Sequence, residues 1–319
     1  MTDSGIGSTS WGMTHAAQDE SLLQLGRWLQ DAGYRFFTPT PATHARVNAR
    51  ATPAQASSLT DVFGWSRLFA RGALPSTAWE LLQASGALRE VGSFFQSEVR
   101  FSTLGKSLYV HSAYPTDAAD SVFFGPDTYR FARMLDALPG TFSRAVDVGT
   151  GTGAGLLSLA ERCGECILAD VNPRALRMSR VNTKLNGHTA TSCHSDLLSG
   201  VTGAFDLIVS NPPYLVDAEE RTYRHGGKRG IELALRLVEA AIPRLGMGGT
   251  LALYTGSPIV AGVDLFEEAV RPQLEDTSLS WRYQTLDVDV FGEELATEAC
   301  SDVDRIAVVS LVAVRHASS

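Results

Sequence analysis

The sequence is poor in the features that mark secreted and membrane-embedded proteins. Its 319 residues include four cysteines, too few for a disulfide framework. No run approaches the ~18 consecutive apolar residues that a membrane span requires. The first thirty residues lack the basic start and apolar core of a secretory signal. The sequence therefore predicts a cytoplasmic protein without a membrane partner, and it leaves the oligomeric state open.

A surplus of basic charge is also missing. Residues 1–112 hold nine Lys/Arg and eight Asp/Glu, whereas residues 113–319 hold eighteen and twenty-seven, a net charge of −9. Proteins that bind nucleic acids usually present a basic face to the phosphates. The charge distribution therefore makes nucleic acid the less favoured partner.

Metal-ligand clusters are scarce as well. Cys163 and Cys166 form a CxxC pair, and Cys193 with His194 supplies two further ligand types. Cys166 is expected to open one strand and Cys193 to lie well along another, whereas a zinc site needs four converging ligands. We predict no metal site and interpret the CxxC as a turn between a helix and a strand, not as a redox pair.

The most informative segment is Asn211-Pro212-Pro213-Tyr214, which ends the apolar run Phe205–Val209. Proline cannot donate to a sheet ladder and fixes φ, so the predicted strand stops in a rigid turn. The carbonyl oxygens of this turn can accept hydrogen bonds from an NH₂ group, and the tyrosine ring offers a flat surface. The four residues are therefore candidate catalytic residues that hold a planar, nitrogen-bearing group.

A glycine-rich turn follows an earlier apolar strand that contains Asp147. Gly149, Gly151 and Ala154 match the dinucleotide fingerprint, so the turn alone also suits NAD. The next apolar run ends at Asp170, which is placed to accept hydrogen bonds from the ribose hydroxyls of either cofactor. The carboxylate of Asp147 separates the two possibilities, because it would repel a diphosphate and attract an α-amino group.

Taken in order, these motifs resemble those of class I S-adenosylmethionine methyltransferases. The resemblance rests on residues 147–153, Asp170, the pair Ser195-Asp196 and residues 205–214. The last segment is most similar to the HemK/PrmC-like glutamine N-methyltransferases and also resembles N6-adenine and N2-guanine methyltransferases. The resemblance covers residues 120–255. It implies a doubly wound, seven-stranded α/β sheet and S-adenosyl-L-methionine as the cofactor.

The resemblance also implies roles for individual residues. The pair at 195–196 is expected at the adenine amino group, and Asn172 is expected to cap a helix beside the adenine. Pro126, Asp127 and Thr128 match the Pro-Arg-Pro-x-Thr-Glu pattern that precedes the glycine-rich turn in HemK-like enzymes, but the arginine is absent and Tyr129 replaces the glutamate. The predicted cofactor-binding residues are Phe124, Pro126, Thr128, Asp147, Gly149, Thr150, Gly151, Gly153, Asp170, Val171, Asn172, Ser195, Asp196, Leu197 and Asn211.

The acceptor remains open among three classes. A protein or peptide glutamine is favoured by the resemblance, with a small-molecule amine, amide or guanidine and an exocyclic base nitrogen of RNA or DNA as alternatives. Residues 217–230 form a long loop with charges of both signs. Together with Asn211, Pro212 and Tyr214, Arg224 and His225 of this loop are candidate substrate contacts. The alternative for the loop is a solvated surface segment. A cofactor-binding protein without catalysis is disfavoured by the intact Asn211.

The chain is predicted to form two domains. Residues 1–112 contain helical patterns, a linker or loop at 51–58, and a hairpin formed by 99–103 and 107–111. This order suggests a small, mainly helical, winged-helix-like domain that recognises substrate. Residues 113–319 form the predicted catalytic domain, in which residues 247–249 end a helix and residues 286–291 pair with 305–314.

Overall fold

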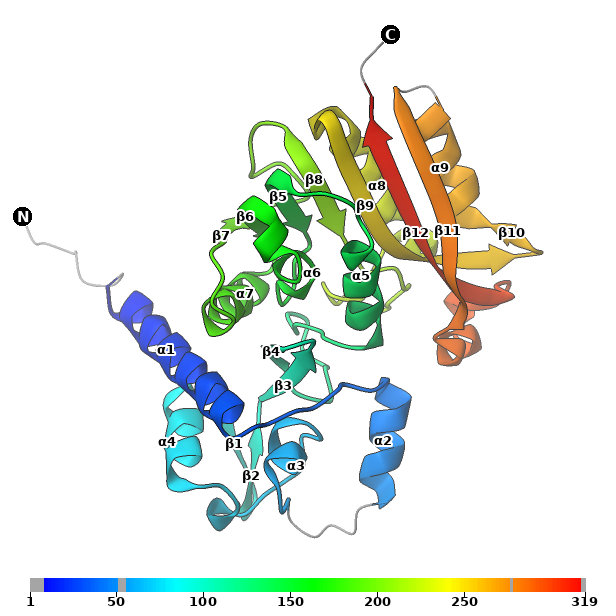
Figure 1. Ribbon diagram of the computed structural model, residues 1–319. Coiled ribbons are helices and arrows are strands. Elements are labelled where there is room, and N and C mark those ends of the chain that lie inside the picture. The colour runs from blue at the N-terminus through cyan, green and yellow to red at the C-terminus, as the bar shows by residue number, and fades with distance from the viewer. Residues whose placement is uncertain (1–8, 51–55, 276–277, 317–319) are drawn as a thin grey trace, which may run out of the picture. The chain divides into compact units, whose positions relative to one another are not determined.

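The computed structural model describes residues 9–50, 56–275 and 278–316 (Figure 1). The chain divides into two compact units. Unit 1 contains the described residues up to Asp117 together with Phe123–Pro126 and Arg180–His188, and unit 2 contains the remainder. Most of the loop predicted at 51–58 lies outside the described residues. Within those residues, no helix combines the length and apolar character needed to cross a bilayer.

Unit 1 consists of helices followed by two β-hairpins, β1–β2 and β3–β4. The predicted hairpin is confirmed as β3–β4, with Gly105 at φ +59° in its turn. The first hairpin was not predicted, because its strands are only four residues long. The elements are α1 (Thr9–Asp31), α2 (Pro41–Arg50), α3 (Leu59–Phe63), η1 (Arg71–Ala73), α4 (Ser76–Ala84), β1 (Leu88–Val91), β2 (Phe94–Ser97), β3 (Val99–Leu104) and β4 (Ser107–Ser112).

Unit 2 is built on one mixed sheet with the strand order β11-β12-β9-β8-β5-β6-β7. The five strands from β9 to β7 are parallel, and β11, β12 and the two-residue β10 are antiparallel to their neighbours. The predicted doubly wound seven-stranded sheet is confirmed. The strands are β5 (Phe142–Val148), β6 (Cys163–Asp170), β7 (Thr191–His194), β8 (Phe205–Ser210), β9 (Leu245–Val260), β10 (Val263–Asp264), β11 (Leu279–Val290) and β12 (Arg305–Arg315).

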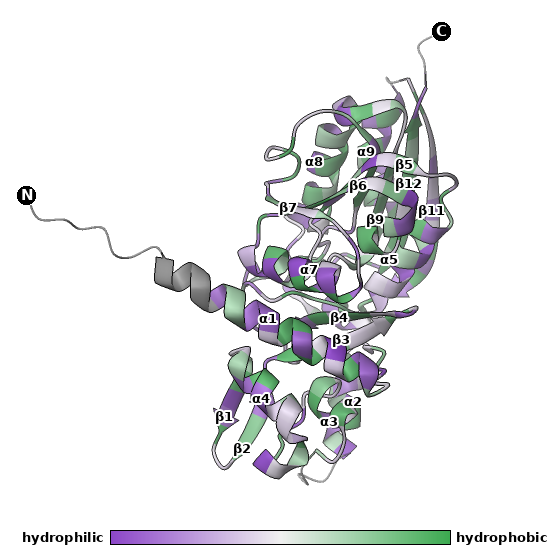
Figure 2. Ribbon diagram, turned by 60° about the vertical axis from the view of Figure 1, so that its left-hand side comes forward, coloured by the Kyte–Doolittle hydropathy of each residue, from purple (hydrophilic) through white to green (hydrophobic). Residues whose placement is uncertain are grey.

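Helices cover both faces of this sheet, with α8 and α9 on one face and α5 on the other (Figure 1). Because side chains alternate along a strand, Val146 and Val148 of β5 enter the core beneath α8 and α9, and Asp147 faces the opposite way. α8 buries one apolar face that includes Leu237 and Val238 (Figure 2). The helices are α5 (Pro126–Asp136), α6 (Ala154–Leu157), η2 (Ala160–Arg162), α7 (Pro173–Leu185), η3 (Lys228–Gly230), α8 (Glu232–Ala241), η4 (Ile242–Arg244), α9 (Leu265–Glu275), η5 (Gly292–Ala296) and η6 (Glu298–Cys300).

The structure corrects two sequence-based boundaries. The CxxC segment is not a turn before a strand, because Cys163 and Cys166 both lie in β6. Residues 247–249 do not end a helix but lie inside β9. Gly248 has φ +76°, and the pairing of β9 with β8 shifts register between Phe205 and Leu207. The glycines therefore mark an irregularity in a continuing strand, not a helix stop. The predicted C-terminal hairpin is confirmed as β11–β12, joined through η5 and η6.

The C-terminal end of α7 belongs to unit 1 and lies against the strand β4. The Asn182 carboxamide accepts from the Val110 N–H at 2.7 Å and donates to the Val110 carbonyl at 3.0 Å. Asn186 pairs in the same way with Leu108, at 3.0 and 2.9 Å. A carboxamide carries an acceptor and a donor in the arrangement of a peptide group. The two asparagines therefore hydrogen-bond to the backbone groups at the edge of β4 as a neighbouring strand would.

Candidate functional site

The glycine-rich turn lies at the carboxyl end of β5, at the edge of the sheet where doubly wound proteins bind ligands. Gly149, Gly151 and Gly153 all have positive φ, at +69°, +54° and +82°. A Cβ atom added to Gly149 or Gly151 would meet no non-neighbouring described atom within 4 Å. The turn therefore borders open space and can receive a ligand close to its backbone.

Asp170, at the end of β6, holds this turn in place. One carboxylate oxygen accepts from the Gly151 N–H at 2.9 Å and the other from the Asn172 N–H at 2.8 Å. The side chain is 8% exposed, and burial raises its pKa. Each carboxylate oxygen has two lone pairs, so Asp170 retains acceptor capacity for ribose hydroxyls.

The two residues after Asp170 have different surroundings. Val171 is 44% exposed, which is unusual for a valine that follows a buried strand. Asn172 accepts from the Arg174 N–H at 2.9 Å, which confirms its prediction as the cap of α7, and it donates to the Asp120 carbonyl at 2.8 Å. The exposed valine beside Asp170 therefore offers an apolar surface for a flat base, whereas the asparagine side chain is engaged.

Asp147 is buried beneath the glycine-rich turn, with 2% of its surface exposed. Its Oδ2 accepts from the Thr150 hydroxyl at 3.0 Å and from the Leu156 N–H at 3.2 Å. Burial is the dominant influence and raises the pKa of Asp147 from 3.8 to about 7. A carboxylate with a raised pKa at a ligand-binding edge is suited to bind a cationic group, whose charge would restore its ionised form.

This pKa shift predicts a pH-dependent stability. Between about pH 4 and pH 7 the folded state binds the Asp147 proton more tightly than the unfolded state, so the free energy of unfolding falls as pH rises through this window. The rise in the pKa of Asp147 from 3.8 to about 7 corresponds to a loss on the order of 4 kcal/mol in the free energy of unfolding above pH 7. Asp147→Asn is therefore expected to unfold at a higher temperature than the wild type at pH 8. Thermal unfolding from pH 4.5 to 8 tests this expectation, and a difference between the two proteins that does not grow with pH would contradict it.

The predicted adenine contacts lie in the turn after β7. The Ser195 hydroxyl donates to the Leu197 carbonyl and accepts from the Gly200 N–H, both at 2.8 Å. Asp196 is exposed, and its carboxylate lies 3.6 Å from the Arg236 guanidinium. Leu197 has φ +49° and packs against the core cluster of unit 2. Ser195 therefore shapes the turn, and the Asp196 carboxylate remains accessible to a ligand.

The Asn-Pro-Pro-Tyr turn follows β8 and is anchored on both sides. The Ser210 hydroxyl donates to the Val148 carbonyl at 2.6 Å, and the Tyr214 hydroxyl donates to Asp127 Oδ2 at 2.6 Å. Between these anchors, Asn211 is half-buried, and no described residue hydrogen-bonds to its carboxamide or to the Pro212 carbonyl. The turn thus holds two oxygen acceptors with unused capacity, one on the half-buried Asn211 and one on the buried Pro212.

Tyr214 is more enclosed than the sequence suggested. Only 8% of its surface is exposed, and its ring lies 5.9 Å, edge to face, from that of Phe291. A Cβ atom added to Gly256 would lie 2.0 Å from Tyr214 Cδ2, so the ring rests directly on this glycine. Burial raises the pKa of the hydroxyl well above its ordinary value. The phenol is therefore a fixed hydrogen-bond donor, and most of the ring surface is already covered.

The loop after this turn is folded back on itself by ion pairs. Asp217 accepts from Arg221 Nε at 2.9 Å and from Nη2 at 2.5 Å, and this hydrogen bonding lowers the pKa of the carboxyl to about 2. Arg224, a predicted substrate contact, instead pairs with Glu294 of η5. His225 Nδ1 accepts from the Asp217 N–H at 3.2 Å. Arg224 and His225 are therefore engaged within the protein, and the loop is not a loose surface segment.

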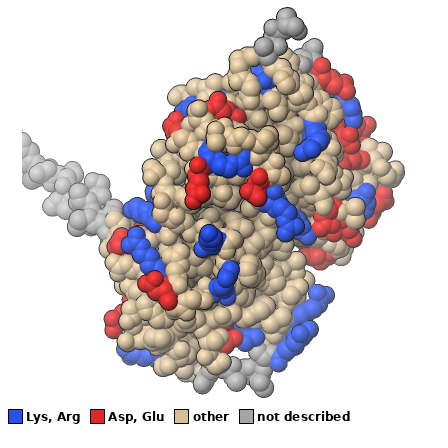
Figure 3. Space-filling view, viewed as in Figure 1, with Lys and Arg blue, Asp and Glu red and all other residues tan. Residues whose placement is uncertain are grey.

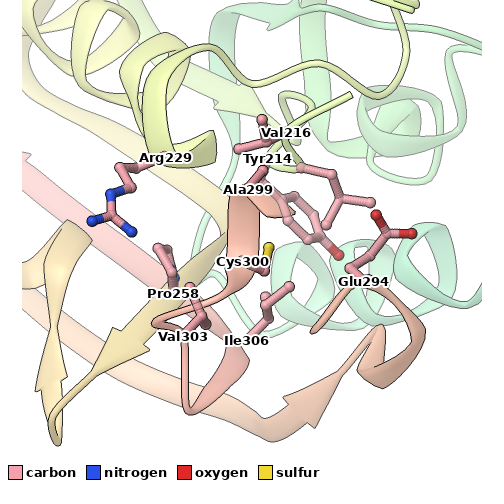
Figure 4. A pocket seen from close by; sticks show the side chains of 10 residues that line it. Tyr214, Val216, Arg229, Pro258, Glu294, Ala299, Cys300, Val303 and Ile306 are labelled. Carbon is pink, nitrogen blue, oxygen red and sulfur yellow. The ribbon is translucent and has the colours of Figure 1, made fainter. Parts of the chain in front are cut away.

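A small pocket lies beside Tyr214 (Figure 4). At its rim, Arg229 pairs with Asp302 through both guanidinium nitrogens, at 2.6 and 2.8 Å. Together with the pair between Arg224 and Glu294, this contact ties the loop to the segment between β11 and β12. The pocket is lined by Tyr214, Leu215, Val216, Arg229, Pro258, Glu294, Ala299, Cys300, Val303 and Ile306.

The segment that precedes the glycine-rich turn in the sequence belongs partly to each unit, with Phe123–Pro126 in unit 1 and the residues from Asp127 onward in unit 2. Phe124 is fully buried in unit 1, with its ring 5.2 Å from that of His111 and 5.8 Å from that of Tyr109. Pro126 begins α5 and Thr128 lies in its first turn, half-buried. A cofactor-binding role for these three residues stays a prediction.

Asp127 is the site residue that sequence reasoning missed. Its buried carboxylate accepts from the hydroxyls of Tyr214 and Tyr254, the latter at 2.7 Å. Residue 127 falls at the unspecified position of the HemK-like pattern, and no sequence spacing relates it to tyrosines about 90 and 130 positions later.

Metal ligands do not converge in the part of the chain that the structure describes. No three His, Cys, Asp or Glu side chains are placed there to hold an ion. Cys163, Cys166, Cys193 and Cys300 are free thiols.

The central part of the chain is similar to known methyltransferases. The family model for the methyltransferase small domain matches residues 131–259. The chain is 40% identical over 123 residues to the release factor glutamine methyltransferase of Deinococcus radiodurans, covering 34% of this chain and 44% of that enzyme. It is 34% identical over 116 residues to ribosomal RNA small subunit methyltransferase C of Serratia proteamaculans, covering 36% of this chain and 31% of that protein. The chain thus spans less than half the length of either relative.

A solved structure agrees on the fold. Trm5b from Pyrococcus abyssi superposes with a TM-score of 0.50 and 15% identity, covering 72% of this chain and 62% of that one. The fold is that of class I S-adenosylmethionine-dependent methyltransferases. The glycine-rich turn and the Asn-Pro-Pro-Tyr turn both lie within residues 131–259, the range that matches the methyltransferase small domain.

Proposed function

We propose that this chain is an N-methyltransferase whose acceptor is a planar amide nitrogen, with a glutamine side chain of a protein or peptide as the favoured substrate. The observation that carries the proposal is the pair of unused oxygen acceptors, the Asn211 carboxamide and the Pro212 carbonyl, held between the anchors at Ser210 and Tyr214. Such a pair can receive both N–H bonds of an NH₂ group.

The residues at the sheet edge suit the cofactor. The open backbone at Gly149 and Gly151 admits a ligand, and Asp147 can accept from its α-amino group. Asp170 is placed for the ribose hydroxyls, the exposed Val171 for the face of the adenine, and Asp196 for the adenine amino group. When bound, S-adenosylmethionine supplies an electrophilic methyl group on a sulfonium.

The protein contributes orientation. An amide nitrogen is a poor nucleophile because its lone pair is delocalised. The oxygens of Asn211 and Pro212 accept its two N–H bonds, favour a tetrahedral nitrogen and fix the direction of the lone pair. Holding reacting groups in this way can supply about 7–11 kcal/mol of the barrier. His225 has no necessary part, because the proton can leave after transfer.

A second candidate acceptor is an exocyclic nitrogen of a nucleic acid base. It is favoured by the similarity to a ribosomal RNA methyltransferase. The charge distribution argues against it: on the face shown in Figure 3, Lys and Arg are scattered, and acidic side chains gather along the edge where β11 lies. An amino-acid-sized small molecule is the remaining alternative. Unit 1, close to neutral in charge, is proposed to recognise the substrate.

The acceptor class can be determined directly. The full chain is incubated with S-adenosylmethionine labelled in its methyl group, in parallel with a glutamine-containing protein fraction, an RNA fraction and a metabolite fraction. Label in the protein fraction, located on a glutamine side chain by mass spectrometry, is the expected result. Label confined to RNA or to metabolites would reject the glutamine proposal and identify the alternative.

A further inference from the structure

The buried carboxylate of Asp127 lies at the centre of a hydrogen-bond network in unit 2. Tyr214 and Tyr254 each donate to a different oxygen of this carboxylate, at 2.6 and 2.7 Å. Arg130 Nη1 lies 3.2 Å from Oδ1, and Arg130 Nη2 extends to Asp287 at 2.8 Å. Asp127 is 7% exposed, so the network is largely removed from solvent, where hydrogen bonds to a charged group are strong.

The two tyrosines belong to different elements. Tyr254 is fully buried inside β9, which is paired on both sides by β8 and β12. Tyr214 ends the Asn-Pro-Pro-Tyr turn, and its ring rests on Gly256 of the same strand β9. Asp127 therefore links Tyr214 at the end of the turn to Tyr254 inside the strand.

We propose that Asp127 is a positioning residue for methyl transfer, which acts through the Tyr214 hydroxyl to hold the acceptor oxygens of Asn211 and Pro212 in their reactive direction. This inference deepens the proposed function and rests on it. With proline at 212 and 213, neither of these residues has an N–H to donate, so the turn depends on the side-chain anchors at its two ends. Loss of the anchor after the turn is expected to misplace the acceptor nitrogen without removing any group that touches it.

Three single variants separate positioning from general stabilisation. Tyr214→Phe removes the hydroxyl and keeps the ring on Gly256. Asp127→Asn removes the charge and weakens both tyrosine contacts. Tyr254→Phe is the matched control, because it removes one hydrogen bond to the same buried carboxylate and leaves the contact to Tyr214 intact. A purely structural network would respond similarly to all three changes.

The expected result is a fall in kcat with little change in the binding of acceptor and cofactor. Tyr214→Phe and Asp127→Asn are expected to lower kcat about 10- to 100-fold, because displacements on the order of 1 Å are this costly for oriented reactions. The KM for the acceptor and the dissociation constant of S-adenosylhomocysteine should change less than about threefold, and Tyr254→Phe should retain kcat within about threefold. The double variant of Asp127 and Tyr214 should be no worse than the poorer single variant. Wild-type kcat in Tyr214→Phe and Asp127→Asn, or an equal loss in Tyr254→Phe, would overturn the proposal.

Amide hydrogen exchange provides a readout that does not require a known acceptor. The Leu215 N–H, directly after the turn, donates to the Arg224 carbonyl at 3.1 Å. Its exchange should be faster in Tyr214→Phe and Asp127→Asn than in the wild type and in Tyr254→Phe, and unchanged exchange would refute the role of Asp127. If the wild-type protein methylates no amide substrate, the proposed function fails, and this exchange comparison still decides whether Asp127 holds the turn through the Tyr214 hydroxyl.

Discussion

Replacement of Asn211 with alanine is expected to reduce kcat by about 100-fold or more while S-adenosylhomocysteine binds with little change. The variant removes one of the two oxygen acceptors that would hold the substrate nitrogen, and loss of one fixed hydrogen-bonding group at a reacting centre typically costs on the order of 100- to 1,000-fold. The Asn211 carboxamide has no hydrogen-bond partner among the described residues, so its removal leaves no buried polar group unsatisfied. Stability should therefore be preserved, as judged by thermal unfolding.

Asn211→Gln provides a matched control for this experiment. It retains a carboxamide but moves it by one methylene, so a positional role predicts a loss close to that of the alanine variant. Activity within about fivefold of the wild type in the alanine variant would remove this residue from the mechanism. A weakened S-adenosylhomocysteine affinity would indicate that Asn211 serves the cofactor instead of the acceptor.

Asp170→Ala is expected to raise the dissociation constant of S-adenosylhomocysteine about 10- to 100-fold. The substitution removes the predicted acceptor for the ribose hydroxyls and also releases the N–H groups of Gly151 and Asn172, which the carboxylate now holds at 2.9 and 2.8 Å. Hydrogen bonds to a charged group contribute about 1.5–3 kcal/mol each, so the turn and the ligand both lose support. Isothermal titration with S-adenosylhomocysteine measures the change.

Asp170→Asn separates the contribution of the ribose contact from that of the support given to the turn. Asparagine keeps one oxygen that can accept from a backbone N–H, so part of the turn is preserved while the charge is lost. An intermediate affinity is expected for this variant. An affinity equal to that of the wild type in Asp170→Ala would contradict the ribose assignment.

The elements that sequence reasoning predicted are those with strong local signals. The apolar runs that end at Asp147, Asp170 and Ser210 became the central parallel strands, because buried strands between helices are continuously apolar. The hairpin at β3–β4 followed from strand patterns around a glycine at positive φ. The glycine-rich turn and its two carboxylates were predicted for the same reason, since glycine permits a turn at positive φ and both carboxylates lie at the ends of apolar runs.

Features that depend on distant contacts were not predictable from the pattern. Glycines at 248 and 249 suggested a helix end because the pairing partner that carries β9 through this irregularity is more than forty residues away. Arg224 was predicted to contact the substrate, and its pairing with Glu294 could not be foreseen because Glu294 belongs to a separate segment. Tyr214 was expected to present an open ring, but the glycine beneath it and the carboxylate at its hydroxyl come from β9 and α5.

The asparagines at the end of α7 have a consequence for dividing the chain. A fragment that starts at residue 113 would keep Asn182 and Asn186 but lose Val110 and Leu108, the main-chain groups to which they bind. It would also uncover Leu185, whose methyl groups pack closely against Gly26. Proteolytic or recombinant separation at this point would thus remove the residues that cover the end of α7. The carboxyl-terminal fragment should therefore be less soluble than the intact chain.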